Sequence, residues 1–195
     1  MEIFIFVFSY IDTEMSIFDI IKKRRSIRSY LDKPVSKEDA IKILDAARLA
    51  PSGGNRQRWK FVYVNEENVL RMIKNCSPGF YGDATAAIII GIELQQEVLG
   101  GASSWSPIGV LDIGFAAENI SLAAHALGLG SCAIASFNAG CISKVINAPE
   151  NFRPVLVFSL GYPDKIPPMP AKKSLSEIVF LNEYGKKWDK LEESE

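Results

Sequence analysis

The stretch that decides the fold is Ala86-Ala-Ile-Ile-Ile-Gly-Ile92, an apolar run without a charged residue. A run of this length, rich in β-branched side chains and bounded by polar segments, predicts a β-strand. Because polar residues do not alternate with apolar ones, both faces of this strand are expected to be buried. The run therefore predicts the centre of a sheet that helices cover on both sides.

Other elements are predicted on both sides of this run. Further apolar runs predict strands at residues 61–64, 131–136 and 155–160. Helical periodicity and capping residues predict a helix that begins at Ser16 and others at residues 36–50, 66–74, 110–127, 142–146 and 174–181. Residues 95–109, rich in Gly and Ser, are expected to form a loop. Strands interleaved with helices predict a layered α/β arrangement.

The composition excludes several classes of protein. The 195 residues have the size of one domain, and 22 Lys and Arg against 23 Asp and Glu leave a net charge of −1. This balance argues against a nucleic-acid-binding protein that relies on overall positive charge. No apolar window is long enough to span a membrane. We expect a single domain at residues 15–195, preceded by an extension at 1–14 that either adds a strand or is dispensable for chemistry.

The cysteines and the single histidine indicate no metal site. Cys76, Cys132 and Cys141 form no C-x-x-C pair, and His125 is the only histidine. We expect three reduced thiols, no need for a disulfide and a cytoplasmic location.

Common catalytic motifs are missing from the sequence. It contains no P-loop, no G-x-S-x-G and no H-E-x-x-H. The run Gly128-Leu-Gly-Ser-Cys-Ala133 has the spacing of a dinucleotide fingerprint, but it follows a helix and opens a strand, the reverse of the required order. His125 lies within a predicted helix, where a packed or surface role is expected. No catalytic side chain is predicted.

The segment Arg24-Arg25-Ser26-Ile27-Arg28 can bind an anion. If it is extended, residues 24, 26 and 28 share one side, and if it is helical, Arg24 and Arg28 still lie one turn apart. Two guanidinium groups and a hydroxyl suit a phosphate monoester. The alternative is a solvated basic helix end that the helix dipole favours.

A second polar cluster is Pro51-Ser-Gly-Gly-Asn-Arg-Gln-Arg-Trp59. Its proline and glycines predict a tight turn with accessible backbone amides, and Ser52, Asn55 and Gln57 add side-chain donors and acceptors. Such a set can read the edge of a planar heterocycle. The alternative is a turn that only joins a helix to a strand. A further basic pair, Lys172-Lys173, precedes the last predicted helix.

Four motifs in this order resemble the nitroreductase family of flavoproteins over residues 16–188. They are R-R-S-I-R from residue 24, A-P-S-G-G-N-R-Q-R-W from 50, H-A-L-G-L-G-S-C from 125 and L-G-Y-P from 160. The resemblance implies an α+β homodimer whose mixed, mainly antiparallel sheet is flanked by helices in three layers. It also implies one FMN per subunit at the dimer interface. Hydride would pass from NADH or NADPH through flavin N5 to a nitroaromatic, quinone or similar small acceptor in a ping-pong cycle.

The resemblance also implies which residues bind FMN. The phosphate and part of the ring are expected at Arg24, Arg25, Ser26 and Arg28, with Lys172 and Lys173 adding to the phosphate site. The turn that reaches the flavin from the partner subunit is expected to comprise Pro51, Ser52, Gly53, Asn55 and Gln57. The backbone of Ile134 and Ala135 is expected against the ring.

The sequence departs from the family pattern at three places. Arg58 replaces a usual proline and Ala135-Ser136 replaces a common Gly-Gly, which bears on substrate access and flavin tuning. Lys172 replaces a commoner arginine, which bears on phosphate affinity. Two other functions stay open: a flavoprotein of a branch that fragments flavin, dehalogenates or carries flavin without NAD(P)H, and a non-enzymatic module whose residues 22–28 bind nucleic acid or anionic lipid.

Overall fold

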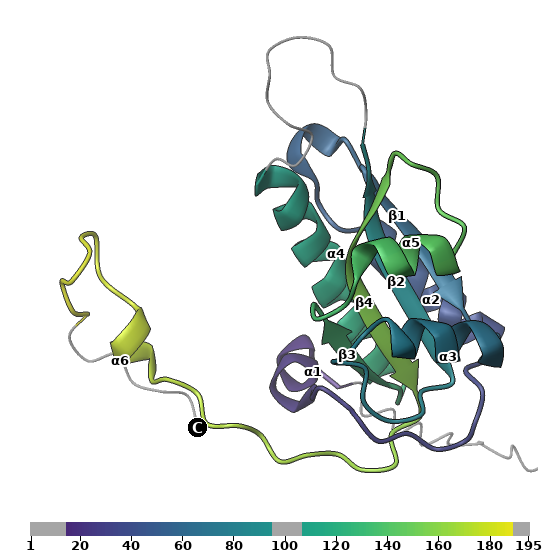
Figure 1. Ribbon diagram of the computed structural model, residues 1–195. Coiled ribbons are helices and arrows are strands. Elements are labelled where there is room, and N and C mark those ends of the chain that lie inside the picture. Colours follow the sequence, from purple (N-terminus) through teal and green to yellow (C-terminus); the bar gives the residue numbers. More distant parts are fainter. Residues whose placement is uncertain (1–14, 95–106, 189–195) are drawn as a thin grey trace, which may run out of the picture.

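The computed structural model describes residues 15–94 and 107–188, which form an α+β fold (Figure 1). Its sheet has four strands in the order β1-β2-β4-β3. Their bounds are Trp59–Val64 (β1), Ala86–Glu93 (β2), Gly130–Ile134 (β3) and Phe152–Gly161 (β4). The helices are Ile17–Lys23 (α1), Lys37–Arg48 (α2), Glu67–Asn75 (α3), Pro107–Ala126 (α4), Ala139–Val145 (α5) and Leu175–Ile178 (α6), with a short 3₁₀ helix at Gly53–Asn55 (η1).

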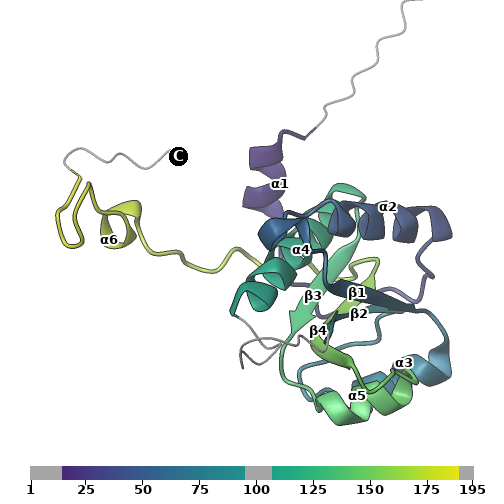
Figure 2. The ribbon, with the colours of Figure 1, turned by 90° about the horizontal axis from the view of Figure 1, so that it is seen from above.

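The predicted central strand is confirmed. β2 pairs with both β1 and β4, and its residues are buried as far as Ile92. Helices α2 and α4 cover one face of the sheet and α3 and α5 cover the other, which gives three layers (Figure 2). All strand pairs among the described residues are antiparallel. The expected mixed sheet is therefore wrong for this part of the chain, where the one parallel bridge lies outside the named strands, between Ser26 and Ser131.

Several helix ends agree with the capping residues in the sequence. Ser16, Ser36 and Asn138 each accept a hydrogen bond from a backbone N–H in the first turn of the helix that follows. Gly128, with φ of +73°, ends α4 in the left-handed conformation that glycine favours.

Some predicted bounds are wrong. The helix α4 begins at Pro107, so the end of the expected loop at 95–109 is helical, while the rest of that loop and the extension at 1–14 lie outside the described residues. The helix α5 starts three residues before the predicted 142, because Asn138 provides an earlier cap. The last predicted helix shrinks to Leu175–Ile178.

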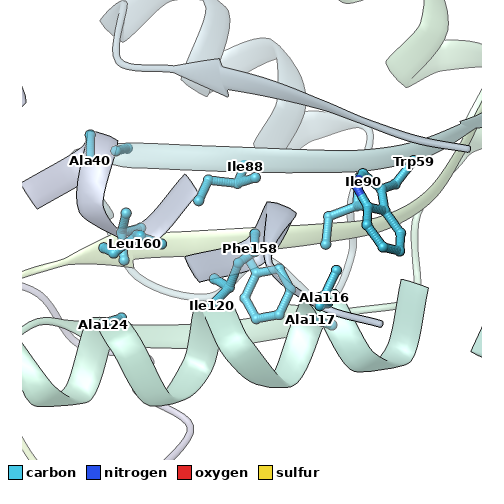
Figure 3. Packing of buried hydrophobic residues seen from close by; sticks show 14 of the residues in the cluster. Ala40, Trp59, Ile88, Ile90, Ala116, Ala117, Ile120, Ala124, Phe158 and Leu160 are labelled. Carbon is cyan, nitrogen blue, oxygen red and sulfur yellow. The ribbon is translucent and has the colours of Figure 1, made fainter. Parts of the chain in front are cut away.

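The larger core lies between the sheet and α4 (Figure 3). Phe158 of β4 and Ile88 and Ile90 of β2 pack toward Ile120 of α4, all almost fully buried. Small residues of α4, Ala116 and Ala124 among them, are also fully buried, so this helix approaches the sheet closely.

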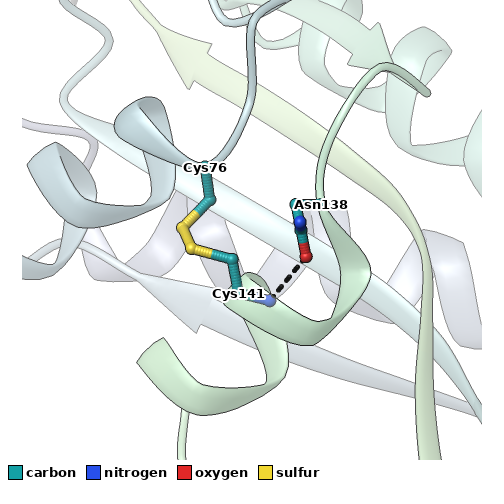
Figure 4. The surroundings of a disulfide bond; sticks show 3 residues. All are labelled: Cys76, Asn138 and Cys141. Atoms are coloured by element: carbon teal, nitrogen blue, oxygen red, sulfur yellow. Dashed lines mark hydrogen bonds between the residues drawn. A yellow bond between two sulfur atoms is a disulfide. The ribbon is translucent and has the colours of Figure 1, made fainter.

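A disulfide between Cys76 and Cys141 joins the end of α3 to α5 (Figure 4). The Cα atoms of the two residues are 5.8 Å apart, a normal separation for such a bond. The expectation of three reduced thiols is therefore wrong, and only Cys132 is free. The sequence could not reveal the pairing, because 65 residues separate the partners and only the packing of α3 beside α5 brings them together. Because the expected cytoplasmic location rested on reduced cysteines, the disulfide removes the support for that expectation.

Residues 163–188, the C-terminal arm, leave the body of the domain (Figures 1 and 2). The arm starts at a bridge between Tyr30 and Pro163 and at a bond from the Asp164 N–H to the Ser29 carbonyl, and α6 lies well away from the sheet. None of the described helices has the length and hydrophobicity of a membrane span.

Candidate cofactor-binding site

The basic segment, residues 24–28, is extended rather than helical. The helix α1 ends at Lys23, and Arg24 has a ψ of 136°. The Ile27 N–H donates to the Ser131 carbonyl of β3 at 2.9 Å, and Ile27 is buried against Gly130, where a Cβ would lie within 2.8 Å of the Ile27 side chain. The segment is thus fixed along the outer edge of β3, with residues 24, 26 and 28 on one side.

The three arginines of this segment differ in their partners. Arg24 lies 3.7 Å from Glu118 of α4, in a pair that is partly exposed. The Arg25 guanidinium donates to the carbonyls of Lys22 and Arg24, each at 2.7 Å. Arg28 is exposed and, within residues 15–94 and 107–188, forms no ion pair with a carboxylate.

Two titratable groups report the positive charge of this region. Burial, followed by Arg24, Arg25 and Lys23, lowers the pKa of His125. Burial raises the pKa of the Cys132 thiol, and Arg28 and Arg24 oppose that rise. Both arginines therefore act on Cys132 of β3, which agrees with the position of the segment beside Ser131 at this edge of the sheet.

The edge of β3 offers backbone hydrogen-bonding groups. β3 is the last strand of the sheet, and the Ser131 carbonyl points away from β4 toward Ile27. Backbone groups point the same way at alternate residues, so the N–H of Ala133 also points outward. No strand of the described chain pairs with this edge beyond Ser131, and Ala133 and Ala135 are exposed.

The turn at residues 51–57 is held by its own hydrogen bonds. The Ser52 hydroxyl accepts from the Gln57 N–H at 3.0 Å, and the Gln57 amide donates to the Asn55 side chain at 3.0 Å. Asn55 and Gln57 both have positive φ, at 53° and 48°. The buried Asp112 of α4 accepts from the Gly53 N–H at 3.0 Å, and Trp59 is buried beyond the turn. The turn is therefore preformed, and its exposed surface carries the side-chain amides of Asn55 and Gln57.

The structure brings some of the predicted residues together and separates others. Arg24, Arg25, Ser26, Arg28, Ile134 and Ala135 lie at the β3 edge, and Pro51, Ser52, Gly53, Asn55 and Gln57 form the turn. The turn contacts α4 near its start, at Asp112, whereas the basic segment lies beside the C-terminal half, near His125 (Figure 1). Along α4, Glu118, which pairs with Arg24, lies roughly 9 Å from Asp112, and His125 lies roughly 20 Å from it, at 1.5 Å per helical residue. Lys172 and Lys173 are exposed on the arm just before α6, and α6 lies away from the sheet (Figure 1).

Three residues that contact the turn or the basic segment were not predicted from the sequence: Asp112, Glu118 and Tyr30. Asp112 stands among apolar residues of the long helix α4 and is only 6% exposed. A carboxylate within an apolar helical run was the feature of the sequence that could have indicated a buried polar contact. A separate cavity of about 650 Å³ opens beside α3 and the 80–85 loop, and none of the predicted site residues lines it.

Comparisons with known proteins identify the family of this chain. The profile of the Nitroreductase family matches residues 21–80 and 70–162. A protein of Methanothermobacter thermautotrophicus, provisionally named NADH dehydrogenase/NAD(P)H nitroreductase, is 36% identical over 80% of this chain and 81% of its own. A protein of Archaeoglobus fulgidus with the same provisional name is 38% identical over 74% and 83%. An FMN-dependent nitroreductase of Clostridium difficile R20291 superposes with a TM-score of 0.73 at 29% identity, over 85% and 98%.

Fold and similarity together define this protein as an oxidoreductase enzyme. The profile covers well over half of the chain and two relatives exceed 30% identity, so the chain belongs to the nitroreductase family.

Proposed function

We propose that this protein is an FMN-dependent NAD(P)H oxidoreductase that works as a homodimer. The observation that carries the proposal is the fixed basic segment beside the open edge of β3. The names of the two relatives support NAD(P)H as the co-substrate, and the name of the C. difficile enzyme supports FMN as the cofactor.

The chemistry of the donors at the β3 edge fits the phosphate of FMN. A phosphate monoester carries nearly two negative charges and accepts paired hydrogen bonds from guanidinium groups. Arg28 is exposed and without a carboxylate partner in the described chain, so its guanidinium is available. The pair of Arg24 with Glu118 is partly exposed and 3.7 Å long, so it is weak and a phosphate can replace it.

The same edge fits the ring of FMN. An isoalloxazine presents carbonyl and ring-nitrogen groups along its edge, and the outward N–H of Ala133 is a matching donor. Ala133 and Ala135 carry small side chains, which let a flat ring approach the backbone.

The chemistry that FMN supplies when bound is the acceptance of hydride from NAD(P)H and its later transfer to a small acceptor. The chain's own residues bind and orient in this scheme. Arg24, Arg28 and Ser26 hold the phosphate, and the β3 edge fixes the plane of the ring. Hydride transfer needs no proton donor on the protein, so we assign no catalytic side chain, and neither His125 nor Cys132 takes part.

A dimer follows from the separation of the two site groups. Within one chain the turn contacts α4 at Asp112, whereas the basic segment lies beside Glu118 and His125 of the same helix, roughly 9 to 20 Å further along. A twofold axis that sets two copies of α4 side by side in opposite directions brings the turn of one protomer to the basic segment of the other. The site is therefore proposed to be complete only between two copies.

Exposed apolar residues on this side support the dimer. Phe18 of α1 is 78% exposed, and Leu111 and Phe115 of α4 are at least half exposed. The arm adds Ile166 and Ile178, both more than half exposed. Such a set of apolar side chains marks an interaction surface.

Two measurements on the purified full-length protein test the proposal. A flavin absorption spectrum, with free FMN released by heating, is expected. Steady oxidation of NADH or NADPH in the presence of a quinone is expected to accompany it. A flavin-containing protein that oxidises neither nicotinamide would instead indicate a flavoprotein of another branch. Protein that is colourless and does not take up FMN would refute the proposal.

A further inference from the structure

Tyr30, two residues beyond Arg28, is enclosed by the ends of the sheet. Its ring lies between two glycines: a Cβ on Gly161 of β4 would come within 3.0 Å of Cδ1, and a Cβ on Gly82 would come within 3.4 Å of Cδ2. A side chain at Gly161 would press on the ring, whereas a side chain at Gly82 would first meet the Arg28 carbonyl oxygen and would only touch the ring. The ring therefore has one well-defined place at the edge of the sheet.

The Tyr30 hydroxyl turns back onto the basic segment. It donates to the Ile27 carbonyl at 2.6 Å and lies 2.7 Å from the Ser159 hydroxyl. Since a phenol has one proton, the Ser159 hydroxyl is the donor in the second bond. Ser159 is 1% exposed, so this bond satisfies a buried polar group as well. Burial raises the pKa of Tyr30, so the hydroxyl stays protonated and remains a donor.

The hydrogen bond from the Tyr30 hydroxyl to Ile27 holds one particular peptide group in place. The Ile27 carbonyl belongs to the peptide that leads into Arg28. The segment is held elsewhere by the Ile27 N–H on Ser131 and by the Leu31 N–H on the Tyr162 carbonyl, each at 2.9 Å. Removal of the hydroxyl would therefore leave the segment attached at both ends while releasing the peptide that directs Arg28.

We propose that Tyr30 is a positioning residue that fixes the Ile27–Arg28 peptide through its hydroxyl and thereby aims the Arg28 guanidinium at the FMN phosphate. The inference rests on the proposed function, because it specifies how that site is held. Tyr30 itself does not touch the flavin in this account.

The test compares FMN with riboflavin, which lacks the phosphate. Full-length protein as purified is titrated with riboflavin, and released FMN is measured by ultrafiltration, which gives the ratio of the two dissociation constants. Tyr30→Phe is expected to reduce the preference for FMN by about tenfold, an effect of the size of one lost hydrogen bond. The control Tyr63→Phe removes the hydroxyl of a half-buried tyrosine on β1 and is expected to leave the preference unchanged.

The outcomes separate the possibilities. A Tyr30→Phe protein with the wild-type preference, or one that loses FMN and riboflavin in parallel, overturns the positioning role. If Tyr30→Phe does not fold, Gly161→Ala displaces the ring while it keeps the hydroxyl, and a preference reduced several-fold is expected; an unchanged preference overturns the inference. Wild-type protein that does not distinguish FMN from riboflavin contradicts the phosphate site of the proposed function instead.

Discussion

The two faces of the sheet differ in how completely one chain covers them. On the α3–α5 face the chain closes on itself: Ile73 and Ile142 are fully buried, and the disulfide joins the two helices. On the α4 face, α1, the outer side of α4 and the arm leave large apolar residues exposed, and the basic segment leaves Arg28 exposed. The closed face provides stability within one protomer, whereas the open face is where we propose that FMN and a second copy bind.

The largest expected effect concerns the closed face. Reduction of the Cys76–Cys141 bond is expected to lower the free energy of unfolding by about 2–4 kcal/mol, because the bond restricts the unfolded chain over a long loop. Urea unfolding with and without dithiothreitol measures this loss. Cys141→Ser should already be destabilised and should not respond to dithiothreitol, while Cys132→Ala should respond like the wild type. A wild-type protein that ignores dithiothreitol would show that the bond does not form.

The next effect concerns the open face. Phe18→Asp is expected to weaken dimerisation by about 2 kcal/mol or more, because a charge replaces an exposed aromatic side chain that the proposed dimer would bury. Sedimentation velocity should show a shift toward monomer at low concentration. Met72→Asp changes an exposed apolar residue on α3 and should leave the dimer intact. If both variants sediment alike, the open face is not the interface.

A smaller effect is expected for the phosphate site. Arg28→Ala should weaken FMN binding by about 1–3 kcal/mol, because a charge-assisted pair of hydrogen bonds is lost. Riboflavin binding should be unchanged, as measured by competition titration. Arg71→Ala removes an exposed arginine from α3 on the closed face and serves as the control. Equal losses for FMN and riboflavin would exclude Arg28 from the phosphate.

The smallest effect concerns His125. Its folded pKa is lowered by burial and by Arg24, and the buried Nε2 has no hydrogen-bond partner among residues 15–94 and 107–188. His125 therefore binds a proton more readily in the unfolded chain than in the folded chain. Its contribution to the free energy of unfolding is fully present above about pH 6.5, where His125 is neutral in both states. The contribution decreases as the pH falls from there toward the folded pKa. Urea midpoints at about pH 7.5 and pH 5.5 should show a shallower decline for His125→Gln than for the wild type. Parallel declines would refute this. Turnover of the variant should stay within a few-fold.

The sequence predicted best what depends on local patterns. The bounds of β2 were predicted to within one residue, because a run with both faces buried has no other place than the centre of a sheet. The basic segment and the turn were found because their residue types are unusual together. The disulfide was missed, because it depends on two helices that pack side by side 65 residues apart in the chain. Whether residues 24–28 are helical or extended was decided by a tertiary bond to Ser131, and the position of Lys172 depends on an arm that leaves the body.

The central claim is that the basic segment of one protomer and the turn of the other form one site. Arg28→Ala and Asn55→Ala, carried on differently tagged chains, are co-expressed, and the mixed dimer is isolated with both tags. Each homodimer has two damaged sites, but the mixed dimer has one site with both mutations and one with neither. Flavin content measured by absorbance should therefore return to one tightly bound FMN per mixed dimer. Mixed dimers that bind FMN as weakly as the two homodimers would show that each site is built within a single chain.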